Sequence, residues 1–192
     1  MGTSFWSQTQ ISQWGVWARV SPRMAGSPTL ITLARVPAVQ AIVEAGLIAG
    51  VLDGLDAIIY FCGMHGIPMR LFFQYIASGA LGTKSLDGGV PTALLGVGFH
   101  FIVATGAAAT YYVLTLAFPM LLRKPLLFGP LFGVGVYLFI YNVVIPMSVA
   151  PPQPRASAGK IINLLFTDTL FVGLSIALVL HNRHPSLAGD YA

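Results

Sequence analysis

Charged side chains are scarce in this sequence of 192 residues. Asp, Glu, Lys and Arg make up 8% of the chain, whereas a soluble domain carries roughly 25%. This deficit argues against disorder, nucleic-acid binding and a water-soluble enzyme. The one cysteine, Cys62, excludes an intrachain disulfide and a cysteine-based metal cluster. The net charge of +4 is spread without a basic stripe, so it favours anionic lipid headgroups over DNA.

Motifs of known catalytic chemistry are also missing. The sequence contains no HExxH pattern, no phosphate loop and no recognisable Ser-His-Asp arrangement. Gly133 and Gly135 form only a lone GxG inside an apolar stretch, which indicates helix packing. The first residues lack the basic region, short apolar core and cleavage site of a secretory signal. The question of enzymatic activity stays open at this point, and the sequence favours a non-catalytic protein.

Apolar residues, in contrast, are abundant: they form 56% of the chain, and the mean hydropathy is +0.78. About 20 apolar residues in a helix cross the bilayer core of about 30 Å. Four stretches reach this length, and they lie at about residues 38–62, 90–116, 125–148 and 160–181. The sequence therefore predicts an all-α integral membrane protein with a four-transmembrane-helix bundle over residues 38–181, followed by a C-terminal tail, 182–192.

An even number of spans places both termini on one side of the membrane. That side would carry six of the ten Lys and Arg residues. Basic residues accumulate on the cytoplasmic side of membrane proteins, so we expect cytoplasmic termini.

Residues 1–37 differ from the rest because they contain all three tryptophans, Trp6, Trp14 and Trp17. Tryptophan prefers the headgroup region of a bilayer. This pattern predicts an N-terminal interfacial arm that lies on the membrane surface. The alternative is a docking arm for a partner protein, since Trp and Arg often anchor interfaces.

A second surface element is expected between the first two spans, at about residues 68–82. Pro68 suits a first helical turn, and Arg70, Gln74 and Ser78 then repeat every four residues. A polar stripe of this kind on an otherwise apolar helix is typical of an amphipathic helix, interfacial or re-entrant.

Polar residues inside predicted spans are costly in lipid and therefore informative. At a rise of 1.5 Å per residue, they lie roughly 10 to 15 Å from the non-cytoplasmic ends of their helices. Several carboxylates at one depth in low dielectric require protons or a bound cation to neutralise them. The residues of this predicted polar layer are Asp53, Asp56, His100, Asn142 and Asp168.

A face of small residues surrounds the two acids of the first span. Gly46, Gly50, Gly54 and Ala57 fall on the same side of that helix as Asp53. Small residues allow close helix approach in membranes. We therefore expect the acids to face the bundle interior.

Three interpretations of the polar layer remain open. The first is a buried hydrogen-bonded network that fixes the register of the helices. The second is a proton or cation pathway, because relays of Asp and His residues commonly carry protons through membrane proteins. The third is a metal centre or a pigment site, for which His100 is the only plausible intramembrane nitrogen ligand.

Several runs of the sequence also resemble a group of small four-helix proteins of the bacterial inner membrane that have no assigned function. The resemblance covers about residues 44–180. It implies four spans and a bacterial inner-membrane location, and it supplies no ligand or catalytic residue. The runs that carry it are Gly46–Asp53 (GLIAGVLD), Tyr75–Gly79 (YIASG), Ala93–Gly96 (ALLG) followed by His100-Phe101, Tyr141–Ser148 (YNVVIPMS) and Phe171–Leu174 (FVGL).

The leading functional hypothesis is a non-catalytic accessory subunit of a larger membrane complex, for example a respiratory or photosynthetic one. Its expected partners are membrane lipids and other subunits of that complex. The first alternative is a small proton- or cation-coupled transporter that uses the Asp/His layer. The second alternative is an intramembrane protein that binds a metal or a pigment through His100.

Overall fold

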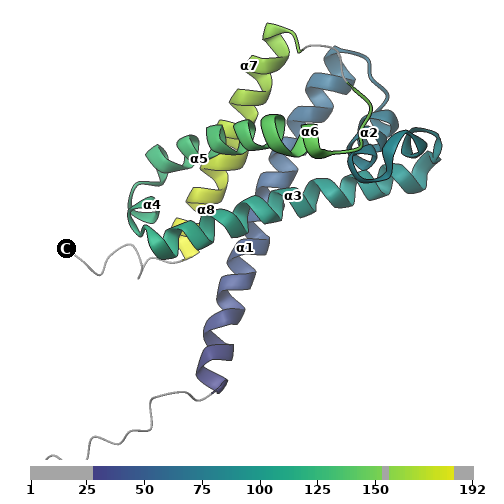
Figure 1. Ribbon diagram of the computed structural model, residues 1–192. Coiled ribbons are helices and arrows are strands. Elements are labelled where there is room, and N and C mark those ends of the chain that lie inside the picture. Colours follow the sequence, from purple (N-terminus) through teal and green to yellow (C-terminus); the bar gives the residue numbers. More distant parts are fainter. Residues whose placement is uncertain (1–27, 153–155, 184–192) are drawn as a thin grey trace, which may run out of the picture. The chain divides into compact units, whose positions relative to one another are not determined.

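The computed structural model describes residues 28–152 and 156–183, with side chains from residue 38 onward, and every element in these ranges is a helix (Figure 1). The chain divides into two units, residues 1–38 and 39–192. The contacts of the polar layer and of the apolar core lie within the second unit. The predicted arm residues Trp6, Trp14 and Trp17 and most of the predicted C-terminal tail lie outside the described residues.

Three helices of the described chain are long and apolar enough to cross a membrane. They begin and end within two residues of three predicted spans. The first is α3, Gly89–Ala117. The second, Pro125–Met147, combines α5 (Pro125–Phe139), η4 (Ile140–Val144) and α6 (Ile145–Met147). The third, Ala158–Arg183, combines α7 (Ala158–Thr167), η5 (Asp168–Leu174) and α8 (Ser175–Arg183).

A further long helix begins upstream of the predicted first span. It runs as α1, Pro28–Ala57, and continues as η2, Ile58–Met64. This helix carries Glu44, Asp53 and Asp56, and it is not among the three helices above. The elements η2, η4 and η5 are π-helical, so three of the long helices contain a locally widened turn.

Glycine permits close contact between α1 and α3, as the sequence predicts. A Cβ atom on Gly46 would lie 2.5 Å from Cα of Thr105, and one on Gly50 would lie 2.8 Å from the Phe101 ring. Ordinary carbon–carbon contacts are about 3.5–4.0 Å. The two helices can therefore approach this closely only because those side chains are absent.

The segment predicted as a surface helix forms the helix α2, Met69–Leu81, which packs against α3 and against the turn η3, Gly82–Asp87 (Figure 1). Most of its polar stripe lies inside the protein. Arg70 is exposed, but Gln74 and Ser78 are buried. The Gln74 amide donates to the carbonyl oxygen of Gly89 at 3.0 Å and to Oγ1 of Thr92 at 3.2 Å.

The burial of Gln74 and Ser78 follows from the hydrogen-bonding demand of the turn between the two helices. The hydroxyl of Ser85 donates to the backbone oxygen of Gln74 at 3.1 Å, and Ser78 donates to the oxygen of Tyr75 at 2.6 Å. Buried polar groups are stable when they are paired in this way. The polar stripe thus joins α2 to the start of α3, and the exposed side chains of α2 include Met69 and Leu71.

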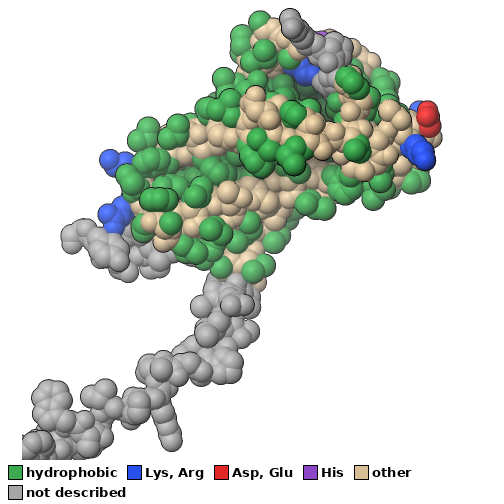
Figure 2. All heavy atoms as spheres, in the orientation of Figure 1, with side chains coloured by type: hydrophobic (Ala, Val, Ile, Leu, Met, Phe, Trp, Pro, Cys, Tyr) green, Lys and Arg blue, Asp and Glu red, His purple; other side chains and the backbone are tan. Residues whose placement is uncertain are grey.

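The apolar core lies where α3 and α8 meet the short helix α4, Met120–Arg123. Tyr111, Leu122, Ile176 and Leu180 are buried there. The Tyr111 hydroxyl donates to the carbonyl oxygen of Leu121 at 3.0 Å. Much of the remaining surface is apolar: hydrophobic side chains cover most of the face in Figure 2, including large exposed side chains of α3 and α5.

Candidate functional site

The polar layer is built around a contact between α1 and α3. Nε2 of His100 lies 2.8 Å from the carbonyl oxygen of Gly50, and Nδ1 lies 3.8 Å from Oδ2 of Asp53. The His100 side chain is 12% exposed and the Asp53 side chain 29% exposed. The ring fits against α1 because Gly54 has no side chain. A Cβ atom on Gly54 would lie 3.3 Å from Nε2, which is shorter than most carbon contacts in proteins.

The partners of His100 determine where its ring proton resides. A carbonyl oxygen can only accept a hydrogen bond, so Nε2 must carry the hydrogen that points at Gly50. In a neutral ring, Nδ1 is then a bare acceptor that faces the acceptor oxygens of Asp53. At 3.8 Å the two atoms lie outside hydrogen-bond distance, and they form an ion pair only when the ring carries a second proton. The pair thus brings two titratable groups from two helices close together.

Two more polar residues stand near this pair. Asp168, the first residue of η5, lies close enough to Asp53 for their charges to interact. Tyr141 of η4 is within electrostatic range of both carboxyl groups. Sequence reasoning missed Tyr141 because a tyrosine in an apolar run resembles an interfacial or core side chain. Its position directly before Asn142, a predicted residue of the polar layer, could have identified it.

Asp56 forms a second contact of the layer, from α1 to α7. Its Oδ2 accepts a hydrogen bond from Nδ2 of Asn163 at 2.9 Å and one from the hydroxyl of Thr167 at 2.7 Å. Asn163 was not among the predicted site residues. It stands four residues before Thr167, so both lie on one face of α7, and this spacing could have identified the pair.

Asn142 is the predicted member that the structure does not bring to the layer. It is exposed, and its amide donates to the carbonyl oxygen of Leu138 in its own helix at 2.8 Å. The polar layer of the described chain therefore consists of Asp53, Asp56, His100 and Asp168 from the prediction.

The widened turns of the helices coincide with this layer. The element η5 begins at Asp168, η4 contains Tyr141, and η2 begins two residues after Asp56. Single π-helical turns inside α-helices occur often at functional sites.

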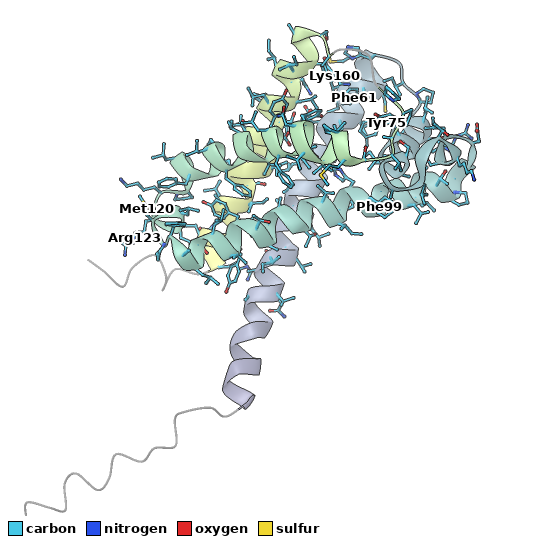
Figure 3. The ribbon with its side chains drawn as sticks, viewed as in Figure 1. Phe61, Tyr75, Phe99, Met120, Arg123 and Lys160 are labelled. Carbon is cyan, nitrogen blue, oxygen red and sulfur yellow. The ribbon has the colours of Figure 1, made fainter. Side chains whose placement is uncertain are left out.

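Figure 3 labels three residues that join neighbouring chain segments near α7 and α2. The Lys160 ammonium of α7 lies over the Phe61 ring of η2, 5.5 Å from its centroid. The Tyr75 hydroxyl of α2 donates to the carbonyl oxygen of Pro151 at 3.1 Å. These contacts connect η2 with α7, and α2 with the proline-rich segment that precedes α7.

The described residues contain no group of three or more His, Cys, Asp or Glu side chains that could hold a metal ion. Both ring nitrogens of His100 face protein groups. The imidazoles of His65 and His181 make hydrogen bonds with the backbone oxygens of Tyr60 and Leu122.

Comparisons of the chain with protein-family models, with curated proteins and with solved structures find no match. The class of protein is thus defined by the fold: a helical chain with three helices long and apolar enough to cross a membrane.

Proposed function

We propose that this chain is a non-catalytic accessory subunit of a larger membrane complex, with four membrane-spanning helices and cytoplasmic termini in a bacterial inner membrane. The fourth span is the helix formed by α1 and η2. Its two layer acids support this assignment, because Asp53 and Asp56 contact His100 of α3 and two residues of α7. Acids paired in this way can reside within a bilayer.

The proposal is supported by the polar layer, whose side chains form hydrogen bonds between helices of this chain. Asp56 accepts two hydrogen bonds from α7, and His100 donates to the backbone of α1. Intramembrane hydrogen bonds of this kind contribute about 1 kcal/mol each. They fix the register of three helices and support a scaffold whose outer faces meet other subunits.

An apolar groove on the outer face of α3 is compatible with such contacts. Gly98 lies within it, and a Cβ atom there would meet nothing within 4 Å. Small residues at a helix surface favour close packing of a neighbouring helix. The groove is lined by Pro91, Leu94, Leu95, Gly98, Phe99 and Ile102.

The N-terminal arm provides the test of partner binding. Deleting residues 1–27 leaves α1 complete and removes Trp6, Trp14 and Trp17. We expect the truncated chain to insert normally and to lose its co-purifying partners after mild-detergent extraction. Deleting residues 184–192 is the matched control and should leave those partners bound. Full retention of the partners by the chain without residues 1–27 would contradict the docking role of the arm.

A proton- or cation-coupled transporter is the second candidate, and the proximity of His100 to Asp53 is the observation in its favour. Asp53, His100 and Asp168 bring three titratable groups from three helices together. In liposomes that contain a pH-sensitive dye, this candidate predicts proton flux that Asp53→Asn abolishes. Asp87→Asn, at an exposed position in η3, is the matched control. Absence of flux from the unmodified chain would exclude proton transport.

A further inference from the structure

A rigid turn joins the end of α3 to the start of α5. Phe118 and Lys124 each precede a proline, which disfavours helical backbone, and both are non-helical, with φ angles of −131° and −127°. The short helix α4 between them is held to α8, because Nδ1 of His181 donates to the carbonyl oxygen of Leu122 at 2.7 Å. The Leu122 side chain is buried. The outer side chains of this turn therefore project from a fixed backbone.

The turn carries two positive charges and no acid. Arg123 and Lys124 are adjacent and exposed, and Figure 2 shows Lys and Arg side chains at this end of the molecule, with hydrophobic side chains beside them. The sequence from Gly88 to Thr167, which includes α3, α4 and α5, contains no Asp or Glu. A surface of this charge favours an anionic occupant.

Exposed apolar side chains flank the basic pair. Phe118 is 56% exposed, Met120 51% and Leu126 73%. They lie close in sequence to the last residue of α3, Ala117, and the first residue of α5, Pro125, at the ends of two helices long enough to cross a membrane. Such helix ends lie at the level of the lipid headgroups, where basic side chains reach the phosphates. We call this surface the α4 corner, and it consists of Phe118, Met120, Arg123, Lys124 and Leu126.

The occupant of the α4 corner has to match both its charge and its apolar flank. An acidic protein segment matches the cations but not the apolar side chains beside them. An apolar helix matches the flank but brings no negative charge to the cations. A phospholipid with a net negative headgroup carries both features in one molecule, at the depth where the corner lies.

We propose that the α4 corner binds an anionic phospholipid of the cytoplasmic leaflet. The planar guanidinium of Arg123 can hold two phosphate oxygens, and Lys124 adds a compact positive charge. The acyl chains lie against Leu126 and against Met120, whose unbranched side chain adapts to irregular partners. The choice of leaflet follows from the cytoplasmic termini proposed above. The lipid site itself does not depend on the accessory-subunit function, because a chain that acts alone can bind it equally well.

Native mass spectrometry of the full chain tests the charged part of this site. The chain is released from nanodiscs that contain equal amounts of phosphatidylglycerol and phosphatidylcholine, and we expect it to retain phosphatidylglycerol. Combining Arg123→Gln with Lys124→Gln should lower the association constant for phosphatidylglycerol about tenfold. Arg70→Gln with Lys84→Gln is the matched control, because it removes two exposed basic side chains from α2 and η3. This control should retain the lipid, and circular dichroism checks that both variants are folded.

The apolar part of the site distinguishes a lipid from free phosphate. Met120→Ser leaves both cations in place and removes apolar contact, so it should weaken the retention of phosphatidylglycerol. An excess of inorganic phosphate should leave the lipid bound, because phosphate cannot replace the acyl chains. In native membranes, a photoreactive amino acid in place of Leu126 should capture phospholipid.

Four results would overturn the proposal. The first is equal retention of phosphatidylglycerol and phosphatidylcholine by the unmodified chain. The second is an equal loss of lipid from the two double variants. The third is unchanged retention by Met120→Ser together with displacement of the lipid by inorganic phosphate, which would indicate an anion site alone. The fourth is capture of another protein or a second copy of this chain at position 126 in place of phospholipid.

Discussion

Replacing Gly46 by alanine tests the helix contact that supports the polar layer. The new Cβ atom would lie 2.5 Å from Cα and 2.6 Å from Oγ1 of Thr105. The hydroxyl can rotate away, but the Cα atom belongs to the backbone of α3. Carbon contacts need about 3.5 Å or more, so α1 and α3 must separate locally by about 1 Å. Overpacking of this kind typically costs about 1–3 kcal/mol.

Gly106→Ala is the matched control for this prediction. Gly106 follows Thr105 on the same helix, and a Cβ atom there would meet nothing within 4 Å. Both substitutions gain about 1 kcal/mol of helix propensity, and this gain cancels when the two variants are compared. We therefore expect Gly46→Ala to be less stable than Gly106→Ala by about 2 kcal/mol.

The assay is reversible unfolding by sodium dodecyl sulfate in mixed micelles, monitored by circular dichroism. The free energy of unfolding of each variant is compared with that of the unmodified chain. Equal stability of Gly46→Ala and Gly106→Ala would refute the close α1–α3 approach, and with it the placement of His100 against Gly50.

The remaining predictions concern polar contacts and orientation. Asp56→Leu should lower the free energy of unfolding by about 1–3 kcal/mol, because the Asn163 amide loses its acceptor, whereas the Thr167 hydroxyl keeps the carbonyl oxygen of Asn163. The same unfolding titration measures it, and an unchanged value would contradict the contact. Glu44→Gln should leave that free energy nearly unchanged, since its partner Arg183 is 57% exposed and solvent screens the pair; a clear loss would show that the pair is shielded from solvent. A reporter fused after Ala192 should be active in the cytoplasm, and activity only in the periplasm would reverse the proposed orientation.

Much of the helical framework follows from the sequence because apolar length is a strong signal. Three predicted spans agree with the structure to within two residues at each end. The face of Gly46, Gly50 and Gly54 was also correctly predicted to face inward. Glycines at intervals of four lie on one side of a helix, and they indicate a contact surface even when the neighbouring helix is unknown.

The choice between two faces of one helix could not be made in the same way. The helix that begins at Pro125 has Gly129 and Gly133 on one side and Gly135 on the other. Sequence reasoning placed Asn142 in the polar layer and interpreted Gly133 and Gly135 together as packing residues. The structure buries Gly129 and Gly133 and leaves Gly135 exposed, because only the first side meets η5. Small residues on both faces make the pattern ambiguous.

The polar stripe of α2 shows a different kind of limit. The spacing of Gln74 and Ser78 correctly places them on one face, but it says nothing of what that face meets. Water and a partly polar helix turn both satisfy an amide group. Only the fold shows that the carbonyl oxygen of Gly89 and the hydroxyl of Thr92 take the place of water at Gln74.

The central claim is that this chain is a subunit of a larger membrane complex. Extraction from native membranes in mild detergent, followed by native sizing and mass spectrometry of the co-migrating proteins, tests it most directly. We predict a large particle with other proteins at fixed stoichiometry. A small particle that contains only copies of this chain would contradict it.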